Sequence, residues 1–234
     1  MTKGNHTAGE NAQDRLAGKL TAAILSGQLP TGTRLPSERE IAAAEGVSKT
    51  VVHSAMEQLG ASGLVAVKPK SGAYVADYMR DGNIGTLNAI VHFNGDDLSR
   101  DAAAAILELR LAIEGMALKC LCAERTAEDV ALLRSKTAAI RAMADDGVAE
   151  AFFDWHRSVC VMSGKSILTL LMNTAHDVSM AFWVRYVGMY GRKFAADRLD
   201  AFADLIEAGD GDGAYKLLSD GIADYLARME PRTT

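Results

Sequence analysis

Basic and hydroxyl side chains gather at two places in the first 80 residues, where they could bind phosphate groups. Ser48 stands at the predicted start of a helix, and Lys49, Thr50 and His53 follow within its first two turns. A helix N-terminus attracts anions through its free N–H groups and its partial positive charge. The second place is a predicted turn, which contains Lys68, Pro69, Lys70, Ser71 and Gly72.

The surrounding pattern predicts how these side chains are positioned. Ser37 and Glu40 form an S-x-x-E capping box for a first short helix, and Gly46 supplies a tight turn before the second. Val52, Met56 and Leu59 recur at helical spacing, which places Lys49 and His53 on or near the opposite, solvent side. A helix over residues 14–26 precedes this unit, and β-prone stretches over 64–67 and 73–75 follow it. This is a winged helix, whose second helix would enter the DNA major groove while its wing follows a phosphate backbone.

Four segments of this region carry a family resemblance: R-L-P-S-E-R-E-I-A, G-V-S-K-T-V-V, G-L-V and S-G-A-Y-V. They resemble the DNA-binding domain of the GntR transcription regulators over about 65 residues. The resemblance assigns DNA contacts to Arg39, Ser48, Lys49 and Thr50, with His53 one turn further along the helix. It assigns the wing to Lys68, Lys70, Ser71 and Gly72. For Arg39 the alternative is a helix-surface pair with Glu38 or Glu40, and for His53 it is simple solvent exposure.

The chain departs from this family pattern at three places. Lys49 and His53 stand where the family usually has Arg, and Ser71-Gly72-Ala73 replaces the usual glycine-rich wing tip. Arg forms a bidentate fork to guanine, whereas Lys does not. We therefore expect the family's docking on DNA but not its usual base preference.

Charge is distributed unevenly along the chain. The whole chain has a formal charge of −5, yet residues 1–80 hold nine Lys and Arg against seven Asp and Glu. The excess of positive charge thus lies with the winged helix. The longest apolar runs are too short for a membrane span, and the polar N-terminus does not resemble a signal peptide. Three cysteines without metal spacing indicate buried, reduced thiols, and together these features predict a cytoplasmic protein.

Almost everything after residue 100 has helical periodicity, including one long apolar helix expected over 167–190. This half resembles the ligand-sensing domain of the FadR branch of GntR regulators. The resemblance is carried by E-L-R at Glu108–Arg110 with Glu114, by D-W-H-R-S-V at Asp154–Val159, and by A-G-D at Ala208–Asp210.

Many members of that branch bind a divalent metal ion through one Asp and three His. When the pattern is aligned with this chain, His156 occupies one of the four ligand positions. Phe152, Leu199 and Gly221 occupy the other three. Asp154 lies two residues before His156 and would point away from it on a helix. We therefore predict no metal ion and no other cofactor.

The resemblance instead favours an acidic effector anchored by Arg110. His156 could also line the pocket, and Arg185 and Tyr186, which follow Trp183 in the sequence, could contact the carboxylate and a ring of the effector. Each basic residue has an alternative role. Arg110 could form an i,i+4 ion pair with Glu114, His156 could be a hydrogen-bonded core residue, and Arg185 could extend to solvent.

These observations predict a mainly α protein. We expect a disordered tail over 1–12, a winged helix-turn-helix over 13–78 and a linker with a short helix over 79–100. An antiparallel bundle of six or seven helices should occupy 101–230. The predicted function is a dimeric repressor that binds a palindromic operator in double-stranded DNA and responds to an organic or fatty-type acid. The alternative is a regulator whose bundle only dimerises. Motifs of hydrolases and of phosphate-binding loops are absent from the sequence, so we expect no enzyme activity.

Overall fold

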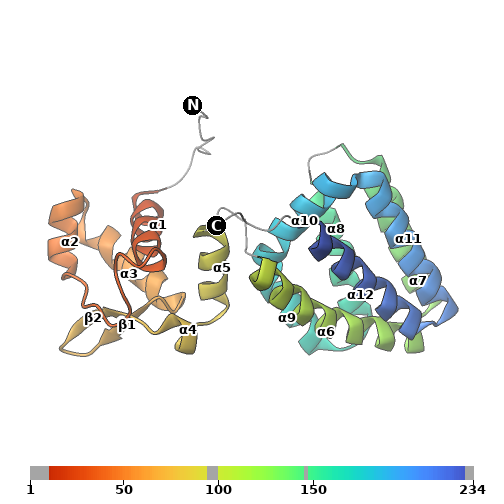
Figure 1. Cartoon of the computed structure of the whole chain (residues 1–234), viewed down its shortest axis with the longest axis horizontal. Coiled ribbons are helices and arrows are strands. Elements are labelled where there is room, and N and C mark those ends of the chain that lie inside the picture. Colours follow the sequence, from red (N-terminus) through yellow and green to blue (C-terminus); the bar gives the residue numbers. More distant parts are fainter. Residues whose placement is uncertain (1–10, 94–99, 145–146, 230–234) are drawn as a thin grey trace. The chain divides into compact units, whose positions relative to one another are not determined.

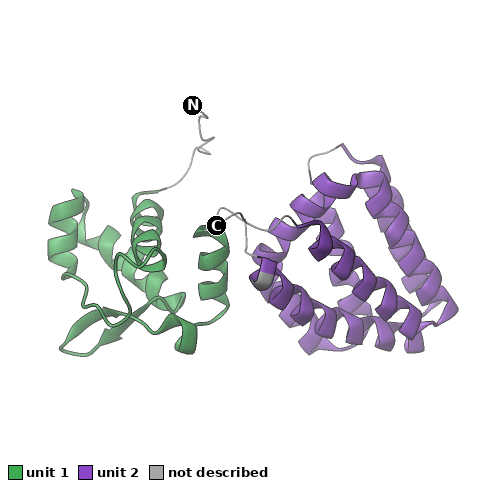
Figure 2. Cartoon of the chain, viewed as in Figure 1, with its two compact units in different colours: residues 1–96 green, residues 97–234 purple. Residues whose placement is uncertain are grey.

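The computed structural model describes residues 11–93, 100–144 and 147–229. The chain divides into two compact units, residues 1–96 and 97–234 (Figure 2). Most of the tail predicted over residues 1–12 lies outside the described residues, but its end does not. Asn11 caps the first helix by accepting a hydrogen bond from Asp14 N at 2.9 Å, and the helix begins at Ala12. Within the described ranges, no helix is long and apolar enough to cross a membrane.

The first unit is built on three helices: α1 (Ala12–Leu25), α2 (Glu38–Glu45) and α3 (Lys49–Ala61) (Figure 1). The predicted capping box of α2 is present. Ser37 N donates to Glu40 Oε2 at 2.7 Å, and Glu40 N donates to Ser37 Oγ at 3.3 Å. Gly46 ends α2 with a φ of 65°, a left-handed conformation that glycine adopts at little cost. The core includes Val52, Met56 and Leu59, as their helical spacing predicts.

A two-stranded antiparallel hairpin completes the winged helix. Strand β1 (Val65–Lys68) pairs with β2 (Gly72–Val75) in a register that sets Val65 opposite Val75 and Lys68 opposite Gly72. Arg34 adds an isolated bridge to Tyr74, which ties the hairpin to the segment before α2. The predicted mainly α fold with a small β-hairpin wing is confirmed.

Two short helices follow the wing, α4 (Tyr78–Asp81) and α5 (Ile84–Phe93). The short helix expected over this stretch is α5. It contacts α1 and therefore belongs to the first unit. Thr86 of α5 is buried, and its hydroxyl donates a hydrogen bond to the carbonyl of Ser62, the residue after α3, at 2.6 Å.

The second unit is a helical bundle. Its described residues form seven helices (Figure 1): α6 (Arg100–Glu124), α7 (Ala127–Ala142), α8 (Val148–Met162), α9 (Ser166–Thr174), α10 (His176–Tyr190), α11 (Arg192–Ala208) and α12 (Gly211–Arg228). The largest fully buried side chains of this bundle include Trp155, Phe152 and Leu118. Trp155 Nε1 donates to the Leu133 carbonyl at 3.1 Å, so the indole is buried with its polar atom satisfied.

The single long helix predicted over 167–190 is wrong, because the chain breaks between α9 and α10 at Ala175. Neither Gly nor Pro occurs at the break, and the weak helix formers Asn173 and Thr174 before it are the only local signal. The break places the His176 ring edge-on to Phe153, with centroids 4.7 Å apart, and brings His176 Nε2 within 3.1 Å of Glu150 Oε2. Tertiary contacts of this kind override helix propensity.

Candidate functional site

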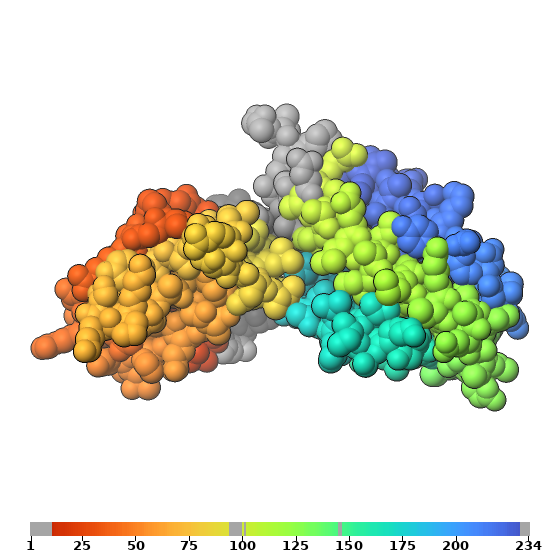
Figure 3. All heavy atoms as spheres, turned by 90° about the horizontal axis from the view of Figure 1, so that it is seen from below, coloured from red at the N-terminus to blue at the C-terminus, as the bar shows by residue number. Residues whose placement is uncertain are grey.

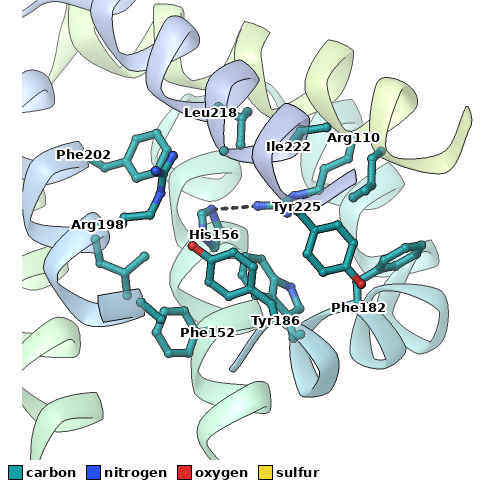
Figure 4. A pocket seen from close by; sticks show the side chains of 15 residues that line it. Arg110, Phe152, His156, Phe182, Tyr186, Arg198, Phe202, Leu218, Ile222 and Tyr225 are labelled. Atoms are coloured by element: carbon teal, nitrogen blue, oxygen red, sulfur yellow. Dashed lines mark hydrogen bonds between the residues drawn. The ribbon is translucent and has the colours of Figure 1, made fainter. Parts of the chain in front are cut away.

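A cavity of about 50 Å³ lies inside the bundle, between α6, α8, α10, α11 and α12 (Figure 4). Most of its wall is apolar and is formed by residues such as Phe182, Leu199 and Ile222. Two guanidinium groups, from Arg110 and Arg198, also line it. An apolar pocket with a few convergent polar groups is the usual form of a small-molecule site.

Arg110 reaches the cavity from α6 while it is held by a buried carboxylate. Its Nε donates to Glu114 Oε2 at 2.8 Å, one turn further along the helix. Its guanidinium also stacks on Trp183, with Cζ 4.4 Å from the ring centroid. Burial opposes ionisation of Glu114, but the charge of Arg110 and the hydrogen bonds from Arg110 and His156 outweigh it and lower the pKa of Glu114 to about 2. Glu114 is therefore the anion that fixes Arg110 in place.

His156 completes this arrangement from α8. Its Nδ1 is hydrogen-bonded to Glu114 Oε1, and its ring stacks on Trp183 with centroids 4.7 Å apart. Burial, together with the nearby charge of Arg110, lowers the pKa of His156 although Glu114 opposes the shift. We therefore assign a neutral imidazole that donates Nδ1–H to Glu114, with Nε2 at the other side of the ring.

Arg198 brings a second positive charge to the cavity from α11. Its Nη2 donates to the Leu217 carbonyl of α12 at 2.6 Å. It also contributes to the lowered pKa of His156, where burial is the largest cause. Burial raises the pKa of Tyr186, which lines the same cavity, so its phenol stays protonated and can donate a hydrogen bond.

A second surface lies on the first unit, at the start of α3. Lys49 and Thr50 are exposed in the first turn of α3, and Arg39 is exposed in α2. Arg39, Lys49 and Gly72 line one surface hollow together with Arg34, which the sequence reasoning had not selected. Ser48 is the N-cap of α3, and its Oγ accepts a hydrogen bond from Val51 N at 3.2 Å. Its hydroxyl is thus engaged in holding the helix start.

Acidic side chains lie between the basic side chains of this surface. Glu38 Oε1 lies 2.8 Å from His53 Nδ1, and Glu38 Oε2 lies 3.9 Å from Lys49 Nζ. Glu57 lies 3.6 Å from the other ring nitrogen of His53. The hydrogen bond and the charge of Glu38 raise the pKa of His53, so the imidazole carries more positive charge near neutral pH than an isolated one.

The wing tip is ordered by Tyr74. Lys68 Nζ lies 4.7 Å from the centre of the Tyr74 ring, and Ser71 Oγ lies 2.7 Å from the Tyr74 hydroxyl. Lys70 has a φ of 60°, a conformation rarely adopted by residues other than glycine, and it projects from the turn as an exposed side chain. The four predicted wing residues therefore lie at one end of the hairpin.

Comparison with known families decides what kind of protein carries these two surfaces. Residues 12–75 match the bacterial regulatory proteins of the gntR family, and residues 105–224 match the FCD domain. The chain belongs to the GntR family of bacterial regulatory proteins and carries an FCD domain. It is a transcription regulator with a helix-turn-helix DNA-binding domain, and its domains and relatives are those of regulators rather than of enzymes.

Relatives in the GntR family span most of the chain. YieP of Escherichia coli (strain K12), an uncharacterized HTH-type transcriptional regulator, is 28% identical over 213 residues, which cover 89% of this chain and 91% of YieP. The HTH-type transcriptional regulator Mce2R of Mycobacterium tuberculosis is 29% identical over 207 residues, which cover 86% and 85% of the two chains. The structure of Listeria monocytogenes Lar shares the fold with a TM-score of 0.64 at 15% identity, covering 96% of this chain and 100% of Lar.

Four positions of this GntR-family chain correspond, by the resemblance, to the metal ligands of the FadR branch. These positions are Phe152, His156, Leu199 and Gly221, and all four line the same cavity. Only His156 supplies a donor atom, so the residues do not fit a metal ion. Asp154 does not compensate, because it pairs with Lys136 and Arg157 instead. Across the described ranges, no group of three or more His, Cys, Asp or Glu side chains is placed to hold a metal.

The predicted effector residues separate into two groups. Arg110, His156 and Tyr186 line the cavity, whereas Arg185 does not. Arg198, and not Arg185, supplies the second guanidinium group of the cavity. Helical spacing contained the signal, because Ala195, Arg198 and Phe202 recur at i, i+3 and i+7 on one face of α11.

Proposed function

We propose that this regulator represses transcription by binding a palindromic operator as a homodimer, and that a small organic acid in the bundle cavity changes its affinity for DNA. The charge of the cavity carries this proposal. Arg110 and Arg198 contribute +2, Glu114 contributes −1 and His156 is neutral, so the net charge is +1 inside an apolar wall. A carboxylate would neutralise that charge.

The surface at the start of α3 supports the DNA half of the proposal. Lys49, Thr50 and Arg39 are exposed where a helix N-terminus would meet a phosphate or a base edge. Lys68, Lys70 and the wing-tip turn lie at one end of the hairpin, where they would contact a neighbouring phosphate backbone. The proposed DNA-contact residues are Arg34, Arg39, Ser48, Lys49, Thr50, His53, Lys68, Lys70, Ser71 and Gly72.

An exposed apolar stripe on α6 supports the homodimer. Leu109 is 58% exposed and Met116 is 56% exposed, and the exposed Ala105 and Ala112 continue the same helical face. In Figure 3, α6 lies between α12 and the α8–α9 segment, both of which it contacts. Large apolar side chains repeated on one exposed helix face are typical of an interface. We propose that a second copy of this chain covers the stripe.

The two sites would be coupled through the dimer. An acid that binds one arrangement of the two winged helices more tightly than another shifts the population toward it. Operator affinity then changes by the same factor as acid affinity, because the coupling is reciprocal. Repression relieved by the acid is the commoner arrangement in this family, and we propose it here.

A regulator that only dimerises through its bundle is the second candidate. The loss of three metal-ligand positions and the small volume of the cavity favour it. A ligand that binds the folded protein raises its melting temperature by mass action. Stabilisation by an organic acid would therefore decide against this candidate.

The direct test is a DNase footprint of the full chain on the DNA upstream of its own gene. The proposal predicts two protected half-sites of related, inverted sequence, separated by about one helical turn or a multiple of it. A single protected site, or protection without sequence preference, would contradict a dimer on a palindrome.

A further inference from the structure

The guanidinium of Arg198 occupies space that the missing side chain of Gly221 leaves open. A Cβ atom at position 221 would lie 3.0 Å from Cζ of Arg198 and closer still to its Nη2. Any side chain at this position would therefore displace the guanidinium. Position 221 is also one of the four positions that correspond to the family's metal ligands, and the neighbouring Leu199 is another.

Arg198 has no acidic side chain at ion-pair distance among the described residues. Arg110 is neutralised by Glu114, but Arg198 forms no ion pair within the part of the chain that the structure describes. Asp224 accepts a hydrogen bond from the Tyr190 hydroxyl at 2.6 Å and pairs with Arg228. The Tyr190 hydrogen bond is the largest cause of its lowered pKa, to which the charge of Arg198 also contributes without a direct contact. One guanidinium N–H of Arg198 binds the Leu217 carbonyl, so several of its five donors are left for a ligand.

We propose that Arg198 stands in place of the metal ion and binds the carboxylate of a short monocarboxylic acid directly. A guanidinium and a divalent cation both attract a carboxylate, but the guanidinium supplies directed N–H donors and needs no protein ligands. This inference rests on the proposed acid effector and specifies how the cavity recognises it. Arg110 and Tyr186, which also carry N–H and O–H donors, line the same space.

The cavity also limits the size and polarity of the acid. A buried water molecule needs roughly 10–15 Å³ of cavity volume. The cavity of about 50 Å³ therefore holds roughly three to five atoms of the size of a water oxygen. A carboxylate group has three heavy atoms, so an acid with one or two further carbons matches that volume. The walls next to the charged groups are aliphatic and aromatic, which favours an unbranched hydrocarbon over a second charged group or a phosphate.

The experiment measures the melting temperature and the binding isotherm of the full chain with acetate, propionate, butyrate, hexanoate and octanoate. Inorganic phosphate and succinate are the comparison anions, and each titration is repeated with EDTA. We expect saturable stabilisation by the short monocarboxylates, weaker effects of the longer acids and of the comparison anions, and the same result with EDTA. Loss of acid binding in EDTA would overturn the proposal in favour of a metal site.

Two pairs of variants test the residues. Arg198→Met keeps the aliphatic stem but removes the donors, and should weaken acid binding by about tenfold or more, as expected for a lost charge-assisted hydrogen bond. Arg185→Met is its control, because Arg185 is an arginine of the same bundle outside the cavity. Gly221→Ala should weaken binding by moving Arg198, whereas Gly188→Ala should not, because a Cβ at Gly188 meets nothing within 4 Å.

The outcomes separate this inference from the proposed function. If no acid stabilises the wild-type chain, the acid effector itself is wrong, and Arg198 has no ligand of this class. If an acid binds the wild type and Arg198→Met equally well, the effector stands and the role of Arg198 is overturned. If Arg185→Met alone weakens binding, the acid lies at another site.

Discussion

Arg110 and Glu114, one turn apart on α6, form a buried ion pair in which Arg110 Nε donates to Glu114 Oε2 at 2.8 Å. Glu114 is fully buried and also binds His156, so one carboxylate holds two cavity side chains from two helices. The two alternatives left open by the sequence for Arg110 are therefore compatible. The residue is paired with Glu114 and faces the cavity at the same time.

Replacing the buried carboxylate should destabilise the protein strongly. Glu114→Gln leaves Arg110 without a counter-charge, and breaking a buried pair in this way costs roughly 3–5 kcal/mol. Chemical denaturation measures this cost, and Glu150→Gln is the control because Glu150 forms only an exposed pair with His176. The double substitution Arg110→Met, Glu114→Gln should cost less than the sum of the two single ones. A loss below about 1 kcal/mol for Glu114→Gln would mean that the pair is solvated.

The pH dependence of stability should report the neutral state of His156. Its pKa is lowered by burial, so below the unfolded value of about 6.5 the unfolded chain binds a proton that the folded chain does not. The stability advantage of the wild type over His156→Gln should therefore shrink as the pH falls from 7.5 to 5, by up to about 1.4 kcal/mol per pH unit.

His176 provides a control of opposite sign. Hydrogen bonds to Asp177 and Glu150 raise its pKa, so its contribution is present below the unfolded pKa and is lost as the pH rises through the folded one. The difference in free energy of unfolding between the wild type and His176→Gln should grow as the pH falls. Equal slopes for the two variants would refute the assignment of a neutral His156.

Sequence periodicity and capping motifs predicted the first unit closely, because local interactions determine it. Ser37 with Glu40 forms the reciprocal capping box that its spacing predicts. The tip of the wing and the start of α3 also lie where the turn residues and Ser48 indicated. These features depend on residues only a few positions apart.

The cavity could be predicted only in part, because it depends on contacts between distant helices. Arg198 meets Gly221 across α11 and α12, and nothing in either segment alone indicates that the missing side chain makes room for a guanidinium. The break at Ala175 was missed for a related reason, since it is stabilised by His176 packing on Phe153. Arg185 was chosen by its proximity to Trp183 in sequence, which is not proximity on a helix face.

Lys49 should determine both affinity and base preference. Lys49→Ala should weaken operator binding by roughly 1–3 kcal/mol if the side chain contacts a base. Lys49→Arg should instead shift preference toward guanine at the contacted position, because Arg reads its O6 and N7 as a pair. Selection from a randomised operator library measures both effects. Lys193→Ala, an exposed substitution in the second unit, is the control, and an effect of equal size there would contradict docking through α3.

The apolar stripe on α6 should set the oligomeric state. Leu109→Glu places a charge in the centre of the proposed interface, where it would be desolvated without a partner. Sedimentation velocity should show a shift from dimer to monomer. Leu132→Glu changes an exposed leucine on α7 and should leave the dimer intact. Dimers of unchanged stability in both variants would place the interface elsewhere.

The most direct test of the account is fluorescence anisotropy of the full chain on DNA from upstream of its own gene, against scrambled DNA, at several salt concentrations. A regulator that reads sequence should prefer its own upstream DNA by about a thousandfold or more, with a steep salt dependence on both DNAs. A short monocarboxylate should then lower the affinity for the preferred DNA. Equal and weak binding to both DNAs, unchanged by the acid, would contradict the account.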